Sequence, residues 1–569
     1  MQKIFRIKLG IVFFVFLYFF FPSLICADSQ GQVKIFFVNS EYSLQSKDKI
    51  QTTLLKVSQE GYFYVEDEWY KNLSQDDKKI IDQNLEILSQ EFDKKIYPKL
   101  TSFYGQEWKP GIDNDTRITI VFHQMKENHI GGYFTNIDEY PRLQNPASNE
   151  REMVYLNTQA LLSQNSKSYL AHEFVHLISF NQKERLRGVT EDFWLNESRA
   201  EYAPTYLGYD DEYQGSNLQQ RVKLFLSAPS DSLTEWKNQK NDYGIINIFT
   251  QYLADQYGNS ILADSLKSEK TGISSINAAL LKAGFSQDFS KIFTDWTITI
   301  YLNDCKFGEK YCYKNQNLKN LRINPSLIFF PATYKTQFLL DYSISQWSGN
   351  WYRIVGGEGK LTVRFAGDLK AKFQIPYVLC QDSSNCKADF MILDNLQKGE
   401  ITFDNFGKDW TSLTLIPSIE NKTSGFGSEE DIYNFSITAS MTNTPQEEKL
   451  IQDLKARILE LQKLISETQA RINAILAKKL VCSKIESNLH YGLQNNQEVR
   501  CLQQFLKSQG SEIYPEGLIT GNFFSLTQKA VVKFQEKYAA EILTPYGLTQ
   551  GSGAVDLATR NKINQLLAK

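Results

Sequence analysis

Residues 171–176 read Ala-His-Glu-Phe-Val-His, an H-E-x-x-H motif in which two histidines stand four positions apart. The chain has only five histidines among 569 residues, so composition alone predicts about 0.005 matches to this pattern. On a helix, His172 and His176 project from one face, which lets both imidazoles reach one Zn²⁺ at about 2.0–2.1 Å. Glu173 then lies beside the ion as a general base rather than a ligand. Two histidines with unrelated hydrogen bonds on an ordinary helix are the alternative interpretation.

A catalytic zinc site needs a third protein ligand and one open position. The run Trp-Leu-Asn-Glu-Ser-Arg-Ala-Glu-Tyr follows at residues 194–202, and its Glu197 and Glu201 are four apart on a second predicted helix. We expect Glu197 to bind the zinc and Glu201 to accept the free N–H of a ligand imidazole. Two alternatives stay open: the roles are exchanged, or the pair lines a solvated helix face.

H-E-x-x-H followed about twenty residues later by W-L-N-E resembles the gluzincin metallopeptidases, the group that contains thermolysin and the zinc aminopeptidases. The region before the motif and the overall size are most similar to the secreted hyicolysin-like family. This resemblance implies a two-lobed α+β zincin catalytic domain over residues 28–325, one catalytic Zn²⁺, and hydrolysis of peptide bonds by water that the metal activates, with Glu173 as the base.

The sequence departs from the aminopeptidase relatives at two points. Asn196, Glu197 and Ser198 stand where those relatives have N-E-G, and the G-x-M-E-N exopeptidase motif is missing from the sequence. These departures favour an endopeptidase, which cuts within chains.

Two further parts of such a site have candidates in the sequence. Gly131, Gly132 and Tyr133 fit a strand edge whose backbone pairs with an extended substrate, although a glycine-bent structural strand fits equally well. Tyr243 precedes Gly244 in a region similar to the one where aminopeptidase relatives carry a catalytic tyrosine. It is our candidate donor to the oxyanion; an ordinary aromatic residue is the alternative.

The N-terminus has the pattern of a secretory signal peptide over residues 1–27. A basic start precedes a mainly apolar run at 11–21, and a short tail ends at Ala27, where a signal peptidase can cut. An uncleaved membrane anchor and lipidation of Cys26 are the alternatives. We therefore expect an exported bacterial protein, secreted or associated with the cell envelope.

Six cysteines remain after Cys26, and they fall into pairs that close short local loops, which agrees with export. A metal cluster is the weaker alternative, because no C-x-x-C spacing occurs. The expected disulfides are Cys305 with Cys312, Cys380 with Cys386, and Cys482 with Cys501.

The remaining sequence divides into modules by its periodicity. Strands and a polar helix predict an α+β lobe at 28–160, and helical apolar spacing predicts a helical lobe at 161–325. Alternating apolar residues predict an antiparallel β-sandwich at 330–442. A stretch without Gly or Pro predicts one long helix at 446–480, followed by a compact unit at 481–569.

The long helix has heptad spacing. Isoleucines recur every seven residues, and an apolar residue or threonine stands three places after each of them. Isoleucine at a with leucine at d favours parallel two-stranded coiled coils, so we expect a homodimer. A lone helix whose stripe packs on a neighbouring module is the alternative. The a positions are Ile451, Ile458, Ile465 and Ile472, and the d positions are Leu454, Leu461, Thr468 and Ile475.

The last module resembles the peptidoglycan-binding family of small three-helix domains. Leu502-Gln503, Phe534-Gln535 and Ala558-Thr559-Arg560 occur in the order of that family, whereas Phe524 and Asp556 replace its usual residues. The resemblance implies a partner in peptidoglycan or the cell wall. The alternative is a helical interaction domain that no longer binds glycan.

The charge balance excludes one class of partner. With 62 basic and 65 acidic residues and a net charge of -3, the chain lacks the basic excess that nucleic-acid binding needs. The sequence therefore predicts an exported zinc endopeptidase that acts on protein or peptide substrates near a cell wall. A zinc peptidase for peptidoglycan stem peptides ranks second. A non-catalytic surface adhesin ranks third, because it would gain nothing from Glu173 between two ligands.

Overall fold

The computed structural model describes residues 27–569 except 127–130, 164, 331–335, 421, 429–430, 443–444 and 480–481. The predicted signal peptide, apart from Ala27, lies outside the described residues. The chain forms two compact units, the first comprising Met1–Val189 and Ala203–Tyr209 and the second Thr190–Tyr202 and Asp210–Lys569. The H-E-x-x-H segment therefore belongs to the same compact unit as the N-terminal strands.

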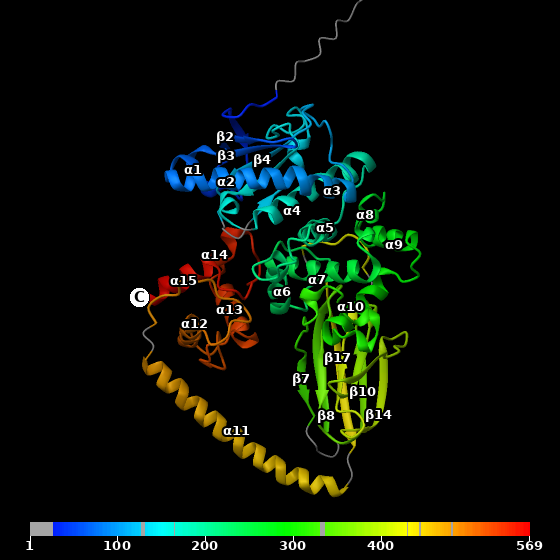
Figure 1. Cartoon of the computed structure of the whole chain (residues 1–569). Coiled ribbons are helices and arrows are strands. Elements are labelled where there is room, and N and C mark those ends of the chain that lie inside the picture. Colours follow the sequence, from blue (N-terminus) through cyan, green and yellow to red (C-terminus); the bar gives the residue numbers. More distant parts are fainter. Residues whose placement is uncertain are drawn as a thin grey trace, which may run out of the picture. The chain divides into compact units, whose positions relative to one another are not determined.

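A six-stranded mixed sheet organises the first unit, in the order β1-β2-β3-β4-β6-β5 (Figure 1). The strands β3, β4 and β6 pair in parallel at its centre, and their residues are all buried, as expected for strands covered on both faces. The other pairs are antiparallel. The strands are β1 Val33–Phe37, β2 Lys49–Val57, β3 Gly61–Glu66, β4 Ile118–His123, β5 Gly132–Tyr133 and β6 Met153–Asn157.

Helices pack against this sheet. The structure has α1 Asp67–Lys71, α2 Gln75–Glu91, α3 Tyr97–Tyr104 and α4 Ser166–Ser179. The predicted polar helix is α2, which begins after Ser74, whose hydroxyl accepts a hydrogen bond from the Asp77 amide. Contacts with β5, β6, α2 and α3 hold α4 in place.

The second unit begins with a helical part, whereas α4, which the predicted helical lobe at 161–325 includes, belongs to the first unit, and α5 spans the division between the units. Its helices are α5 Phe193–Tyr206, α6 Asn217–Ser227, α7 Lys240–Tyr257, α8 Ser260–Leu266, α9 Gly272–Lys282 and α10 Phe289–Leu302. The two helices α6 and α7 approach so closely that a Cβ on Gly244 would lie 2.6 Å from the Phe225 backbone nitrogen. Glycine at this position therefore sets the distance between them.

Two sheets of a β-sandwich follow, in the orders β14-β10-β17-β8 and β13-β12-β15-β9-β7. The prediction of a wholly antiparallel sandwich is wrong at one edge, where β7 and β9 pair in parallel. The chain passes through β8 in the opposite sheet between these two strands, so it returns in its original direction. The strands are β7 Ser326–Phe329, β8 Thr336–Ser345, β9 Tyr352–Val355, β10 Gly359–Gly367, β12 Pro376–Asp382, β13 Asn385–Phe390, β14 Lys398–Phe406, β15 Ser412–Leu415 and β17 Ile432–Thr442, with the small pair β11 Phe373–Gln374 and β16 Ser418–Ile419.

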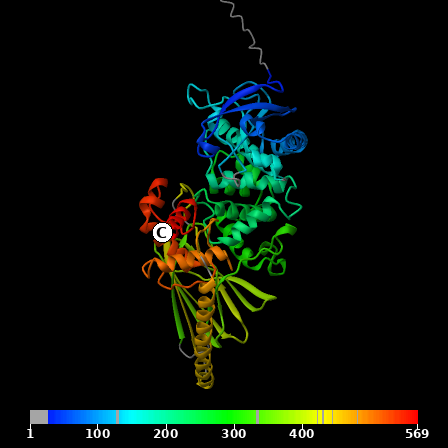
Figure 2. The same cartoon turned by 90° about the vertical axis from the view of Figure 1, so that its left-hand side faces the viewer.

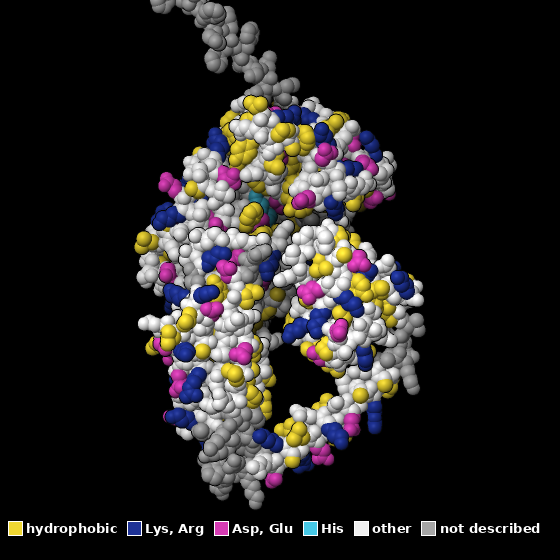
Figure 3. All heavy atoms as spheres, turned by 180° about the vertical axis from the view of Figure 1, so that it is seen from behind, with side chains coloured by type: hydrophobic (Ala, Val, Ile, Leu, Met, Phe, Trp, Pro, Cys, Tyr) yellow, Lys and Arg dark blue, Asp and Glu magenta, His cyan; other side chains and the backbone are white. Residues whose placement is uncertain are grey.

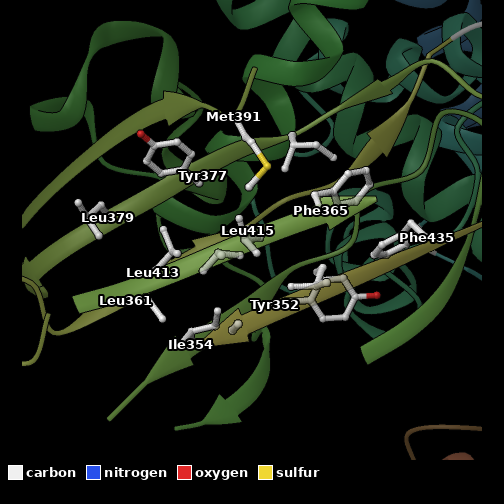
Figure 4. Close-up of a cluster of buried hydrophobic side chains, with 14 of the residues drawn as sticks. Tyr352, Ile354, Leu361, Phe365, Tyr377, Leu379, Met391, Leu413, Leu415 and Phe435 are labelled. Carbon is white, nitrogen blue, oxygen red and sulfur yellow. The ribbon is translucent and has the colours of Figure 1, made fainter. Parts of the chain in front are cut away.

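Alternating side chains of the two sheets meet in one apolar core, as Figure 4 shows. Ile354, Leu413 and Leu415 extend from one sheet, and Leu361 and Phe365 from the other. All five are almost fully buried, which explains the period-two pattern of the sequence.

The predicted long helix is α11 Pro445–Lys479, a single continuous helix in Figures 1 and 2. The apolar a and d side chains that the structure describes are 43–66% exposed, and Figure 3 shows apolar and charged side chains interspersed along the helix. The coiled coil itself stays a prediction. These exposed side chains are Leu454, Ile458, Leu461, Ile465, Ile472 and Ile475.

The C-terminal module contains three longer helices, as predicted, and a short fourth helix. They are α12 Gln497–Ser508, α13 Ser525–Lys537, α14 Ala539–Ile542 and α15 Leu557–Leu567. Two buried glutamines make equivalent bonds: Gln503 accepts from the Gly521 amide and donates to Thr527, and Gln535 accepts from the Gly553 amide and donates to Thr559. The module is therefore built from two similar halves.

Candidate functional site

Helix α4 brings His172, Glu173 and His176 together. The Nε2 atoms of the two histidines lie 3.1 Å apart, and one ligand atom from each of the three side chains lies within 4.8 Å of the others. Glu173 and His176 are buried, and His172 is partly exposed. Among the described residues, this is the one group of three His, Cys, Asp or Glu side chains with such convergent atoms.

The separation of the two imidazole nitrogens fits a zinc ion. Two nitrogens bound tetrahedrally at about 2.0–2.1 Å from one Zn²⁺ lie roughly 3.3 Å apart. The distance between the Nε2 atoms of His172 and His176 is close to that value. Imidazole nitrogens suit zinc and other transition metals rather than harder cations such as magnesium or calcium.

Aromatic packing fixes the other side of α4. Phe174 stacks on Tyr97, with ring centroids 5.5 Å apart, and meets Phe92 edge-on at 5.3 Å. A π-helical segment, Phe180–Arg185, continues α4 directly. In it, Asn181 and Gln182 both donate hydrogen bonds to the Gln106 carbonyl, at 2.8 and 2.7 Å. These contacts determine where the histidines of α4 lie.

The backbone of the edge strand β5 passes directly beside Glu173. A Cβ on Gly132 would lie 2.9 Å from the Glu173 Cγ and 2.5 Å from the Tyr155 carbonyl oxygen. A Cβ on Gly131 would lie 2.4 Å from the ring of Tyr169, one helical turn before Glu173. Both glycines are therefore needed for the close approach of β5 to α4.

Strand β5 is the last strand of its sheet in the part of the chain that the structure describes, because it pairs with β6 alone. The predicted strand edge is thus present at Gly132. The Tyr133 ring, by contrast, is buried and stacks on Tyr155 at 4.5 Å, and burial raises the Tyr133 pKa. Its backbone, not its hydroxyl, is the part available to an extended ligand.

Glu197 and Glu201 both lie on α5, four residues apart as predicted. Glu197 is half-buried, whereas Glu201 is fully buried. Arg221 binds the Glu201 carboxylate through two nitrogens, at 2.6 and 2.7 Å. The amides of Asn217 and Asn247 donate to the same carboxylate at 3.1 and 3.3 Å. The carboxylate of Glu201 is therefore held in one orientation by a cation and two amides.

The Arg221 guanidinium also contacts the candidate Tyr243. Its central carbon lies 4.9 Å from the centre of the Tyr243 ring, and Trp236 meets the same ring edge-on at 4.9 Å. Arg221 thus connects two predicted site residues, Glu201 and Tyr243. Arg221 was not predicted as a site residue, because a lone arginine on an amphipathic helix carries no sequence signal of such a role.

All three predicted disulfides are present. They join Cys305 to Cys312, Cys380 to Cys386, and Cys482 to Cys501. Disulfides persist in oxidising compartments, so they indicate an extracellular or secreted protein. Among the described residues, no helix has both the length and the apolar character needed to cross a bilayer.

Comparisons with known proteins assign no family to the chain. No family model and no curated protein matches the chain. Among solved structures, the pre-peptidase C-terminal domain of a Bacillus anthracis collagenase is similar at 12% identity and a TM-score of 0.14, covering 20% of this chain and 94% of that one. Aeromonas hydrophila PliG, a periplasmic inhibitor of g-type lysozyme, is similar at 12% identity and a TM-score of 0.14, covering 21% of this chain and all of that one. Likenesses at this TM-score carry no conclusion about fold or function.

Proposed function

We propose that the protein is a zinc-dependent endopeptidase, exported and held near a bacterial cell wall by its C-terminal module. The observation that carries this proposal is the convergence of two imidazole nitrogens, 3.1 Å apart, with a buried carboxylate between them in sequence. The resemblance of the H-E-x-x-H and W-L-N-E segments to gluzincin metallopeptidases supports it as well.

In this proposal, His172, His176 and Glu197 hold the metal. Glu201 acts as a positioning residue that orients one of the ligand histidines, and Arg221 holds the Glu201 carboxylate in one orientation through two nitrogens. Zinc held by these side chains supplies Lewis acidity to water and to the substrate carbonyl.

The chain's own groups carry out the proton transfers and the binding. Glu173 accepts a proton from the attacking water at its carboxylate and passes it to the leaving amine. The Tyr243 hydroxyl donates a hydrogen bond to the oxyanion of the tetrahedral intermediate. The backbone of Gly132 pairs with an extended substrate along the open edge of β5.

The C-terminal module favours a second candidate substrate. If it binds peptidoglycan, it delivers the catalytic domain to stem peptides as well as to proteins of the cell surface. We rank protein substrates first, because the resemblance is to families that cut proteins. A non-catalytic adhesin is the remaining alternative.

Parallel digestion of casein and of purified sacculi by the zinc-loaded protein tests this proposal. We expect casein fragments, loss of activity with a zinc chelator, and recovery on adding zinc. Soluble muropeptides from sacculi without casein cleavage would favour the stem-peptide candidate. If neither substrate gave a product, the non-catalytic adhesin would be the remaining interpretation.

A further inference from the structure

The loop between α6 and α7 connects two candidate site residues, because Arg221 lies on α6 and Tyr243 lies on α7. This loop spans residues 228–239 and forms neither helix nor strand. Its central residues, 232–235, are nevertheless at most 2% exposed. A buried loop must find partners for its backbone and its polar side chains, since it has lost contact with water.

The β-sandwich supplies several of these partners. The backbone amide of Leu233 donates to the Trp347 carbonyl at 2.9 Å, and the Ser232 hydroxyl donates to the Gln346 carbonyl at 2.7 Å. Gln346 and Trp347 directly follow β8 and are themselves buried. The sandwich therefore holds the centre of the loop.

A buried ion pair joins the same loop to the sandwich. The Glu235 side chain is fully buried, and Lys422, in the segment after β16, reaches its Oε1 at 3.1 Å. Lys422 also lies 3.6 Å from the exposed carboxylate of Asp431. A carboxylate without hydration is costly unless a cation and hydrogen bonds compensate for it. The sandwich thus provides a cation that compensates Glu235 for its burial.

The sandwich also directs a carboxylate into the helical part. Glu420, two residues before Lys422, is 4% exposed. It accepts hydrogen bonds from the hydroxyls of Ser290 and Thr294, which both lie on α10. Charged groups of opposite sign, two residues apart in the sandwich, therefore both find their partners in the helical part.

Aromatic packing completes this interface. The Trp347 ring meets Phe289 and Phe293 edge-on, with centroids 5.0 and 5.3 Å apart, and the Trp351 indole donates to the Thr297 carbonyl at 2.9 Å. Domains that move independently usually meet through more polar surfaces than this. The sandwich and the helical part therefore share one buried interface.

The loop ends beside Tyr243. Trp236, which directly follows Glu235, meets the Tyr243 ring edge-on at 4.9 Å. The carboxylate of Asp242, immediately before Tyr243, accepts from two backbone amides of the same loop at 3.0 and 2.8 Å. The position of the Tyr243 ring thus depends on a loop that the sandwich holds.

We propose that the β-sandwich positions the Tyr243 hydroxyl for peptide hydrolysis, with Lys422 and Glu235 as positioning residues. This role rests on the proposed function, in which Tyr243 donates to the oxyanion. A donor that is misplaced by about 1 Å can cost up to about 10²-fold in rate. Because the oxyanion forms only during the reaction, the ion pair should affect kcat more than KM.

Hydrolysis of casein by full-length, zinc-loaded variants tests this role. Lys422→Met removes the cation, and we expect kcat to fall about tenfold with KM within about twofold of the wild type and unchanged zinc content. Lys422→Arg keeps the charge and should retain most of kcat. Arg364→Met is the matched control, because Arg364 pairs with Glu400 at 2.6 Å within the sandwich, where both side chains are exposed. It should behave like the wild type.

A second comparison separates positioning from general destabilisation. Tyr243→Phe removes the hydroxyl and should lower kcat by about 10²-fold. If Lys422 acts through Tyr243, adding Lys422→Met to Tyr243→Phe should lower kcat no further, because the donor is already missing. A purely structural effect would multiply the two losses.

The outcomes distinguish the positioning role from the proposed function. The positioning role alone would be overturned by an active wild type in which Lys422→Met keeps its kcat, or loses the same factor with and without the Tyr243 hydroxyl. A wild type without zinc-dependent hydrolysis would overturn the proposed function, and the positioning role with it. If Lys422→Met failed to fold, its combination with Glu235→Gln would replace it in both comparisons, because that pair leaves no uncompensated charge.

Discussion

Arg221 of α6 contacts both Glu201 of α5 and Tyr243 of α7. A fully buried carboxylate is costly unless a cation and hydrogen bonds compensate for its lost hydration. Arg221 supplies both through its two-pronged contact, which compensates the Glu201 carboxylate for its burial. Because Arg221, Asn217 and Asn247 already occupy the Glu201 carboxylate, we propose Glu197 rather than Glu201 as the metal ligand.

The roles of the two glutamates of α5 predict different losses of metal. Glu197→Ala should empty the zinc site and abolish activity, because it removes a ligand. Glu201→Ala should weaken zinc binding by about 10–100-fold, as loss of an outer partner does. Zinc titration of both variants measures the difference. If Glu201→Ala empties the site and Glu197→Ala does not, the two assignments must be exchanged.

The buried carboxyl group of Glu152, directly before β6, predicts a particular dependence of stability on pH. Because burial raises the pKa of Glu152 from 4.5 to about 8, the folded state binds more protons than the unfolded state in this window. The free energy of unfolding should therefore fall as pH rises from about 4.5 to 8. Denaturant titrations at several pH values measure it. The fall should be smaller in Glu152→Gln; an equal fall in this variant and the wild type would contradict this explanation.

At the scale of elements, the spacing of residues in the sequence predicted those features that lie within one helix or one strand. The four-residue spacing of His172 and His176 predicted that both imidazoles converge on one side of α4, and the period-two pattern predicted the sandwich strands. Spacing does not predict contacts between elements. The sequence pointed to Gly131 and Gly132 as a strand edge, but their close approach to Tyr169 and Glu173 depends on how α4 packs. Arg221 was missed for the same reason.

Strand β5 provides a test of that packing. Gly132→Ala places a Cβ 2.5 Å from the Tyr155 carbonyl and 2.9 Å from the Glu173 side chain, so the strand and the base must move apart. We expect kcat/KM on extended peptides to fall by up to about 10²-fold, with unchanged zinc content. Gly427→Ala, at a glycine with nothing within 4 Å, is the matched control. Full activity in Gly132→Ala would show that the close approach has no catalytic importance.

Helix α11 carries the prediction about assembly. Its exposed a and d side chains gain burial if two copies pair. Sedimentation equilibrium at micromolar concentration should therefore give a dimer. Ile458→Asp plus Ile465→Asp should give a monomer, whereas Ala456→Asp plus Ala470→Asp adds the same charges away from the a and d positions and should stay dimeric. A monomeric wild type would contradict the coiled coil, and paired wall-binding modules with it.

At the scale of the whole molecule, changes of periodicity along the chain predicted the order of strand-rich and helical segments. They did not predict how the chain divides into two compact units or how the strands pair. The parallel pairing of β7 with β9 depends on a passage through the opposite sheet, and a local pattern does not record such a path. The burial of Glu107, Glu139 and Glu152 is similarly hidden, because an acidic residue in the sequence gives no sign that the fold will bury it. The repeated Gln503 and Gln535 networks were visible as a recurring glutamine, but not as a structural repeat.

The most direct test of the central claim is one measurement on Glu173→Gln: zinc content together with casein hydrolysis. The substitution replaces a carboxylate by an amide of the same shape, so it removes a base but no metal ligand. We predict about one zinc per chain, as in the wild type, and no hydrolysis above the uncatalysed rate. Retained hydrolysis, or loss of zinc from this variant, would contradict the proposal that Glu173 is the base of a zinc peptidase.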